Sequence, residues 1–440
     1  MKTTYMIIAA IVVIIIIIGG VFAYIAISPP AKPAATPAPT AAPTASPTTA
    51  PTASPTAVPT ATPTVAPTTA PTPTPAPTPT PAPLAAATLT GNGGTLVAPL
   101  MSTWLVFYAQ AEPQISITYN AVGSGAGITD FIVDGLGNFG ESDAPLTAAQ
   151  YAEVPTTPAG QTCLTIPITA SAVVPAYRLP LTNGALMTNG LNFTGPVLAQ
   201  IFMGNITMWN DPQIQALQSP SIAALLPNTA ILCVHRSDSS GTMFAFTDFL
   251  YDTSSAWATA VGPPSTSPSI WPIIPNEVTE PKNAGVAGYI STTNDTIGPL
   301  EISYILENPG ETSLYYGAVE NAAGNFILAN DTNIAATLAA GATMLPAGNA
   351  SWTTVSIIDN TYKNATATTI YPIVTMTYAL VYQQQTNQAQ GAALVNFLSW
   401  IVNSGQEYGI SEGYVALPAS IITIDNTTLA SITYNGVPIE

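Results

Sequence analysis

Basic side chains are scarce in this sequence: its 440 residues contain 6 Lys and Arg and a single His, against 23 Asp and Glu. A surface that binds nucleic acid needs clustered Lys and Arg to displace the counterions of the phosphate backbone, so the composition excludes nucleic acid as a partner. Charged residues of both signs make up only 7% of the chain, and the formal net charge is -17. We therefore expect a polar surface with few charges.

Cysteine is almost absent as well. Cys163 and Cys233 are too far apart for a Cys-x-x-Cys motif, and a single His leaves no set of ligands for a structural zinc ion, so we expect no metal and no cofactor. In an exported protein the two cysteines favour a disulfide bond. The alternative is a pair of buried thiols that pack as small apolar side chains.

One long apolar run stands at the N-terminus, where residues 6–27 carry no charge. A helix of this length spans a bilayer at about 1.5 Å per residue. A cleaved signal peptide is the alternative, but its apolar core has about 7–15 residues, so the pattern favours a membrane anchor in residues 1–28. Lys2 predicts a cytoplasmic N-terminus, and the rest of the chain is then expected at the cell surface, outside the cell.

Residues 29–85 consist almost entirely of Pro, Thr and Ala. Such a segment cannot bury a core, and its prolines favour an extended spacer of about 3.1 Å per residue, which predicts a disordered stalk. The folded body contains several Asn-x-Ser/Thr sequons, which predict a glycoprotein. These sequons begin at Asn192, Asn205, Asn294, Asn330, Asn349, Asn364 and Asn426.

Beyond the stalk, segments typical of strands alternate with segments typical of helices. Residues 114–122 alternate apolar and polar side chains, which predicts a strand. Residues 95–113 predict a helix with Pro99 in its first turn. Its apolar side chains on or near one face are Leu100, Trp104, Phe107 and Tyr108. The alternation predicts an α/β fold that binds its ligand at the carboxyl ends of strands.

Three loops share one design, in which glycine and hydroxyl residues stand directly before an expected helix. They are 93–96, 123–127 and 239–242. The first N–H groups of a helix lack partners and carry partial positive charge, glycine allows close approach, and Ser or Thr adds a donor. Ser and Thr are also common N-caps, so one such loop proves little. Three of them predict an anion-binding site.

Charged residues accompany these loops. Arg236 precedes the third loop, and its planar guanidinium suits a tetrahedral oxyanion. Asp238 either holds that guanidinium or caps the following helix. Asp143 repels a bound anion unless the ligand carries a proton to donate to it. It would therefore select hydrogen phosphate over fully ionised sulfate, because an unpaired buried charge costs about 3–5 kcal/mol.

Several motifs, in this order, resemble the phosphate-binding protein of the high-affinity phosphate ABC transporter. They include TGNGGTLVAPLMSTW, YNAVGSGAGITDF, NFGESDAPL, HRSDSSGTMFAFTDFL, NAGVAGYI and YPIVTMTYALVY. The likeness extends over residues 87–421 and is weakest over 308–363. It implies a two-lobed type II periplasmic-binding-protein fold with a hinge. Lobe I would comprise residues 86–165 and 373–440, and lobe II residues 166–372.

The resemblance also implies the residues of the site. Asp143 would read the proton of phosphate, Arg236 would be the cation, and Asp238 would steady Arg236. The implied phosphate-binding residues are Thr95, Leu96, Ser124, Asp143, Arg236, Ser240, Gly241 and Thr242. The chain departs from the family pattern at Leu96, where Phe is usual, and at Glu141, where a small residue is common. We expect Glu141 to add negative charge near the rim of the cleft.

The implied function is extracellular, high-affinity binding of inorganic phosphate and its delivery to an ABC transporter permease with its ATPase, by a monomer that is not an enzyme. One alternative is another oxyanion, such as sulfate or molybdate. A second is a hydrolase with Ser240 as nucleophile, His235 as base and Asp238 as the residue that orients it. A third is a surface-layer or adhesive protein. The low density of charge also predicts a protein that stays folded in acid.

Overall fold

A computed structural model describes residues 83–158, 160–306, 313–362 and 367–439. The expected membrane anchor over 1–28 lies outside the described residues, as does the expected stalk up to residue 82. Within the described ranges, no helix combines the length and the hydropathy that a membrane span requires.

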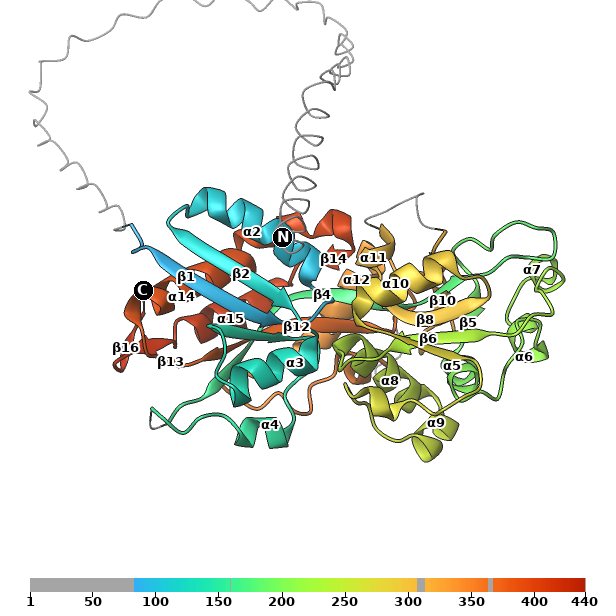
Figure 1. Ribbon diagram of the computed structural model, residues 1–440, viewed down its shortest axis with the longest axis horizontal. Helices are drawn as coiled ribbons and strands as arrows, with labels where there is room; N and C mark the ends of the chain where they lie inside the picture. Colours follow the sequence, from blue (N-terminus) through green and yellow to red (C-terminus); the bar gives the residue numbers. More distant parts are fainter. Residues whose placement is uncertain (1–82, 159, 307–312, 363–366, 440) are drawn as a thin grey trace, which may run out of the picture. The chain divides into compact units, whose positions relative to one another are not determined.

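The folded body is built on a mixed sheet of 10 strands, with the path β2-β1-β3-β12-β4-β8-β6-β7 (Figure 1). β14 and β9 join the sheet through β4. The strands are β1 (Ala87–Gly93), β2 (Ile115–Ala121), β3 (Phe139–Ser142), β4 (Cys163–Arg178), β6 (Leu232–Arg236), β7 (Glu277–Glu280), β8 (Thr296–Glu301), β9 (Tyr315–Tyr316), β12 (Val374–Tyr382) and β14 (Tyr414–Val415). The strand expected over 114–122 is thus confirmed as β2.

β4 belongs to both halves of the sheet. Its first part pairs antiparallel with β12, from Cys163 opposite Tyr382 to Ala172 opposite Val374, and its second part pairs antiparallel with β8. Every residue of this 16-residue strand except Arg178 is buried, because helices and neighbouring strands cover both faces. β12 and β4 cross the middle of Figure 1, with β1 and β2 on one side and β6 and β8 on the other.

Helices flank the strands of each half. They are α2 (Ala98–Ala111), α3 (Ser124–Ile128), α4 (Ala148–Ala152), α5 (Gly195–Phe202), α6 (Pro212–Gln215), α7 (Pro220–Ala223), α8 (Gly241–Thr253), α9 (Ser255–Ala260), α10 (Lys282–Thr292), α11 (Ser303–Leu306), α12 (Asp331–Gly341), α13 (Ile357–Tyr362), α14 (Gln388–Val402) and α15 (Ala419–Leu429). Short strands complete the fold: β5 (Asn192–Phe193), β10 (Ala318–Glu320), β11 (Phe326–Ile327), β13 (Gln384–Gln385), β15 (Thr433–Tyr434) and β16 (Val437–Pro438). The chain is therefore α/β, as its sequence predicts.

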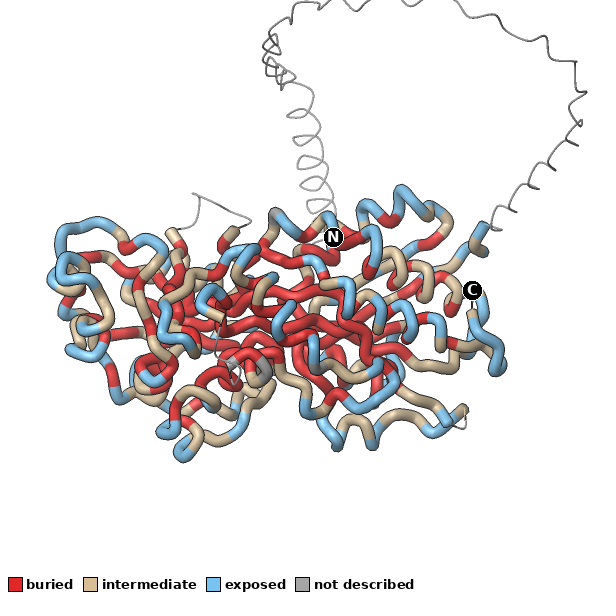
Figure 2. Tube along the Cα trace, turned by 180° about the vertical axis from the view of Figure 1, so that it is seen from behind, coloured by how far each residue is buried: buried red, intermediate tan, exposed pale blue. Residues whose placement is uncertain are grey.

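Each half of the sheet has its own apolar core. One core joins α2 and α14 to β1 and the start of β4, and the other joins α5 and α8 to β6, β8 and the rest of β4. Figure 2 shows buried chain running through the middle of both halves and exposed segments around them. This arrangement is the two-lobed type II binding fold. The exact lobe boundaries remain a prediction.

The expected face of α2 is confirmed with one exception. Leu100, Trp104 and Tyr108 are buried, and the Trp104 indole N–H donates to the carbonyl of Gly405 at 2.7 Å. Phe107 is 39% exposed instead, with its ring stacked on Tyr408 at a centroid distance of 4.2 Å. The residue lies at the edge of the apolar face, where contact with a neighbouring ring replaces burial.

The expected disulfide bond is wrong, since Cys163 and Cys233 are both free, buried thiols. Cys233 pairs with Ile297 of β8, and Ile297 pairs with Tyr177 near the end of β4, whereas Cys163 begins β4. At about 3.3 Å per residue, the strand from Cys163 to Tyr177 measures on the order of 45 Å. A disulfide needs Cα atoms within about 7 Å, so the two thiols pack as apolar side chains in separate clusters.

Candidate anion-binding site

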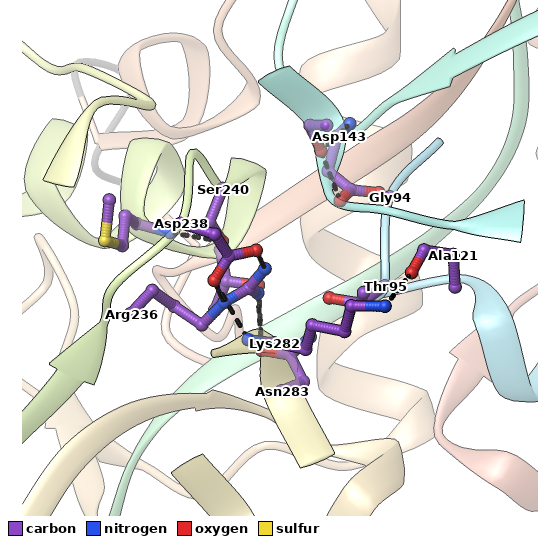
Figure 3. A network of polar contacts seen from close by, with 12 residues as sticks. Gly94, Thr95, Ala121, Asp143, Arg236, Asp238, Ser240, Lys282 and Asn283 are labelled. Carbon is purple, nitrogen blue, oxygen red and sulfur yellow. Dashed lines mark hydrogen bonds and ion pairs between the residues drawn. The ribbon is translucent and has the colours of Figure 1, made fainter. Parts of the chain in front are cut away.

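The three glycine and hydroxyl loops lie at the carboxyl ends of strands, where the two halves of the sheet meet. The first follows β1, the second follows β2, and the third leads from β6 into α8. A Cβ atom on Gly125 would collide with the Ser239 side chain, and one on Gly241 would lie 2.9 Å from the Asp143 backbone. Glycine at these positions therefore allows loops from the two halves to touch. Figure 3 shows the polar residues that gather there.

Arg236 is fully buried and held by partners on two sides. Its Nε donates to Asp238 Oδ1 at 2.7 Å, its Nη2 bonds to Oδ2 of the same carboxylate, and its Nη1 donates to Asn283 Oδ1 at 3.2 Å (Figure 3). Burial raises the pKa of Asp238, but the hydrogen bonds and charge of Arg236 outweigh that effect and leave it below its ordinary value. Of the two roles open to Asp238, the structure shows the ion pair.

The start of α8 presents backbone donors beside Arg236. Ser240 is the N-cap, and its Oγ accepts the N–H of Met243 at 3.5 Å. The N–H groups of Gly241 and Thr242 lie in the first turn, where an α-helix supplies no acceptor. The Thr242 hydroxyl donates to Asn283 Oδ1 at 3.3 Å, so its hydrogen is directed at a protein atom.

The loop after β1 contributes a buried hydroxyl group. Thr95 is 3% exposed, and its Oγ1 has no hydrogen-bond partner among the described residues. Its carbonyl accepts the Tyr304 hydroxyl at 2.7 Å, and the Leu96 carbonyl accepts the Tyr414 hydroxyl at 2.6 Å. These bonds fix the backbone of the loop and leave the Thr95 hydroxyl for a ligand.

Asp143 is bonded to the loop after β2 and to β12. Its Oδ2 accepts the Ser124 hydroxyl at 2.9 Å, and its Oδ1 accepts the Thr377 hydroxyl at 2.7 Å. Ser124 Oγ in turn accepts the Asp143 N–H at 3.1 Å. Burial raises the pKa of Asp143, and although these hydroxyl groups and the charge of Arg236 lower it, the balance stays above the ordinary value. The Ser124 hydroxyl is thus committed to Asp143 in this structure.

Glu141 is not on the rim of the cleft, as its sequence position suggested, but completely buried. The side chain points into the space that Gly93 and Gly94 leave open, where a Cβ on Gly94 would lie 2.8 Å from Glu141 Oε2. Burial, followed by the neighbouring charge of Asp143, raises the pKa of Glu141 well above its ordinary value. The side chain is covered because two adjacent glycines make room for it.

Sequence reasoning missed three side chains at this site. Asn283 is buried, and its Nδ2 has no partner among the described residues. Lys282 reaches from α10 to the Ala121 carbonyl at the end of β2, at 2.6 Å. Thr377 holds Asp143 from β12. The signals were present: Lys282 and Arg236 are two of only 6 basic residues, and Asn283 begins one of the family motifs.

His235, the proposed base of the hydrolase alternative, is turned toward other partners. Its ring stacks on Trp271 at 4.9 Å, and its Nε2 lies 3.6 Å from Glu277 Oε2. Burial lowers its pKa below the ordinary value. Neighbouring residues of a strand point to opposite faces, so His235 and Arg236 project away from each other. His235 Nδ1 lies 3.2 Å from the Arg236 carbonyl oxygen, so the ring meets the backbone of Arg236 and not the cluster around its guanidinium.

Buried donors dominate the site as a whole. The Thr95 hydroxyl, the Asn283 amide, the Arg236 guanidinium and the start of α8 converge from both halves of the sheet. A buried donor without a partner costs about 1–3 kcal/mol, so a set of them indicates a ligand rich in acceptor atoms. An oxyanion fits this description.

Comparisons with known proteins agree on one family. A family model described as a PBP superfamily domain matches residues 51–404. The phosphate-binding protein PstS of Xylella fastidiosa is 32% identical over 334 residues, which cover 76% of this chain and 82% of that protein. PstS of Methanocaldococcus jannaschii is 31% identical over 342 residues, covering 76% and 83%.

Solved structures share the fold at lower identity. A high-affinity periplasmic phosphate-binding protein determined with bound phosphate aligns with a TM-score of 0.57 and 18% identity, covering 80% of this chain and 100% of that chain. A phosphate-binding protein from Stenotrophomonas maltophilia aligns with a TM-score of 0.57 and 17% identity, covering 80% and 96%.

Proposed function

The chain belongs to the PBP superfamily and, within it, to the PstS phosphate-binding proteins, and from this membership we propose that it binds inorganic phosphate between its lobes and delivers it to a phosphate ABC transporter. The partners would be the permease and ATPase of that transporter. The protein would act as a monomer, without catalysis and without a cofactor.

One observation carries the proposal: buried donors from both halves of the sheet converge around Arg236, opposite the acceptor Asp143. The proposed phosphate contacts are the Thr95 hydroxyl, the backbone N–H groups of Leu96, Gly241 and Thr242, the Ser240 hydroxyl and the Arg236 guanidinium. Ser124 would line the same site with its hydroxyl hydrogen donated to Asp143. Asp238 already neutralises Arg236. Oriented dipoles and hydrogen bonds would therefore provide most of the attraction for the anion.

Asp143 would give the site its selectivity. Hydrogen phosphate has a proton to donate to this carboxylate, whereas sulfate at neutral pH has none. Sulfate would face Asp143 as a like charge without a shared hydrogen. This argument ranks sulfate and molybdate below phosphate.

The two lobes would close on the ligand. We propose lobe I as residues 86–165 with 373–440, and lobe II as residues 166–372. Continuity of β4 through both halves supports a hinge, and the contact between Lys282 and the Ala121 carbonyl supports a closed arrangement.

We further propose that residues 1–28 anchor the protein, that residues 29–85 form its stalk, and that the glycosylated body works outside the cell.

Isothermal titration calorimetry of residues 83–440 with phosphate and sulfate tests the proposal. We expect one phosphate per chain and sulfate affinity at least about a hundredfold weaker, which corresponds to roughly 2.7 kcal/mol. Arg236→Ala should abolish most phosphate binding. Arg178→Ala is the matched control, because Arg178 bonds Asn294 and the Ser291 carbonyl away from the site. Absence of phosphate binding by the unmodified protein would refute the proposed function.

A further inference from the structure

Glu141 and Tyr119 close a ring of hydrogen bonds around the backbone of Gly94. The Gly94 N–H donates to Glu141 Oε2. Tyr119 Oη lies 2.6 Å from the same Oε2 and 2.8 Å from the Gly94 carbonyl oxygen. Gly94 directly precedes Thr95, whose hydroxyl is a proposed phosphate donor, so this ring holds one wall of the site.

The hydrogens in this ring can be counted. A tyrosine hydroxyl has one hydrogen, and a carbonyl oxygen only accepts. Tyr119 Oη has two oxygen neighbours at hydrogen-bond distance, so two hydrogens are needed for two bonds. Tyr119 provides one, to the Gly94 carbonyl, and only a protonated Glu141 can provide the other, to Tyr119. The geometry is satisfied when Glu141 is a neutral acid.

Its surroundings favour the same state. Glu141 is 0% exposed and lies beside Asp143, and a Cβ on Gly94 would be 2.8 Å from one carboxyl group and 2.5 Å from the other. When two buried carboxyl groups lie side by side, the charge of one raises the free energy of ionising the other. Burial and the charge of Asp143 raise the pKa of Glu141 by more than its contacts with Tyr119 and Gly94 lower it, and the direction agrees with the hydrogen count.

Few other titratable groups act on this pair. Tyr119 faces Glu141 from β2, and Asp143 follows it at the end of β3. Arg236 of β6 acts on Asp143, and Tyr304 of α11 acts on Tyr119. No basic side chain bonds to Glu141 among the described residues.

We propose that Glu141 is a proton-dependent positioning residue of the phosphate site. As a neutral acid it holds the Gly94–Thr95 backbone and leaves Asp143 as the one charged carboxylate of the pair. On ionisation Glu141 opens the ring of hydrogen bonds and repels the anion. This inference rests on the proposed phosphate function. Phosphate binding is then strong at acidic pH and weakens as rising pH removes the Glu141 proton.

Phosphate affinity measured by calorimetry from about pH 5 to about pH 9 tests the inference. Glu141→Gln stays neutral and keeps one of the two bonds at that position, so at low pH it should bind within about tenfold of the unmodified protein. Across the range, the unmodified protein should lose at least about tenfold more affinity than Glu141→Gln. The ionisation of phosphate itself affects both proteins equally. Glu153→Gln, at an exposed position, should match the unmodified protein.

Parallel pH profiles for the unmodified protein and Glu141→Gln would overturn the inference while leaving phosphate binding intact. If the unmodified protein binds no phosphate at any pH, the proposed function fails, and infrared spectroscopy of the ligand-free protein still decides the proton. At neutral pH the spectrum should contain the C=O stretching band of a protonated carboxylic acid that Glu141→Gln lacks. Absence of that band would also overturn the inference.

Discussion

Asp143 accepts two hydroxyl hydrogens and still has capacity to accept another. An ionised carboxylate offers about four lone-pair sites, of which Thr377 and Ser124 occupy two. The hydroxyl groups also fix the plane of the carboxylate, so that a ligand proton meets an oriented acceptor. The Asp143 side chain therefore makes the binding affinity depend on whether the anion carries a proton.

Asp143→Asn should reduce the preference for phosphate over sulfate. The amide keeps the shape and removes the charge that repels sulfate, and its N–H₂ can donate to any oxyanion. We expect the ratio of the two affinities, measured by calorimetry, to fall by about 10–100-fold. An unchanged ratio would show that selectivity arises elsewhere in the site.

Asp425 of α15 is a further buried acid, apart from Glu141 and Asp143. It is 0% exposed, and neither carboxyl oxygen has a hydrogen-bond partner among the described residues. Burial raises its pKa to about 9. A group with a raised folded-state pKa adds stability that is complete below its unfolded pKa of about 4 and is lost as pH rises toward the folded value.

Asp425→Asn should therefore flatten the dependence of unfolding free energy on pH between about 4 and 9. The slope that this carboxyl contributes is about 1.4 kcal/mol per pH unit. Urea unfolding at several pH values measures it, with exposed Asp134→Asn as the control. Equal slopes for the unmodified protein and Asp425→Asn would contradict the assignment.

At the scale of elements, the contact between the start of α8 and the end of β3 decides how closely the halves approach. Gly241 is the first residue of α8, and its missing side chain accommodates the Asp143 backbone. The same position is helical, where alanine stabilises a helix by about 1 kcal/mol relative to glycine. Alanine at position 241 would therefore stabilise α8 but hinder the close approach of the two halves of the sheet.

Gly241→Ala should weaken phosphate binding by at least about tenfold, because the added methyl group meets backbone that cannot rotate away. Gly288→Ala in α10 is the matched control, since a Cβ there meets nothing within 4 Å. It should raise thermal stability slightly and leave binding unchanged. Calorimetry and thermal unfolding separate the two effects, and full binding by Gly241→Ala would argue against close approach at this contact.

The sequence predicted the individual elements better than the tertiary contacts between them. The glycine loops, the strand β2 and the buried face of α2 follow from local patterns along the sequence. Burial of Glu141 and commitment of the Ser124 hydroxyl to Asp143 depend on how β1, β3 and the loop after β2 pack together. The mistaken disulfide has the same origin, because the distance between Cys163 and Cys233 is set by the length of β4.

At the scale of the whole molecule, most shifted carboxyl groups share one direction. Burial is the first cause of the raised pKa values of Glu141, Asp143, Asp331, Glu412 and Asp425. Asp238 and His235 have lowered values, and their contributions are lost as pH falls. From these directions we expect the folded state to be favoured in acid, which is also the expectation from the low charge density of the sequence.

The urea midpoint of the unmodified protein should accordingly be higher at about pH 5 than at about pH 9. Each carboxyl group with a raised pKa loses its contribution as pH climbs through its folded-state pKa, and Asp238 matters only below its unfolded value of about 4. His235 acts in the opposite direction, but only below its unfolded pKa of about 6.5 and as one group against several carboxyl groups. A midpoint that increases from pH 5 to pH 9 would contradict this balance.

The register of β12 against β4 is irregular between Thr377 and Tyr378. A bulge interrupts the ladder and increases its local twist, so amide hydrogens here exchange with solvent more readily than those on either side. Thr377 also donates to Asp143, so this irregular point of the ladder lies beside the carboxylate that we propose contacts phosphate. Deuterium uptake at the Tyr378 amide should therefore slow when phosphate occupies the cleft. Exchange at this strand would then report whether phosphate is bound.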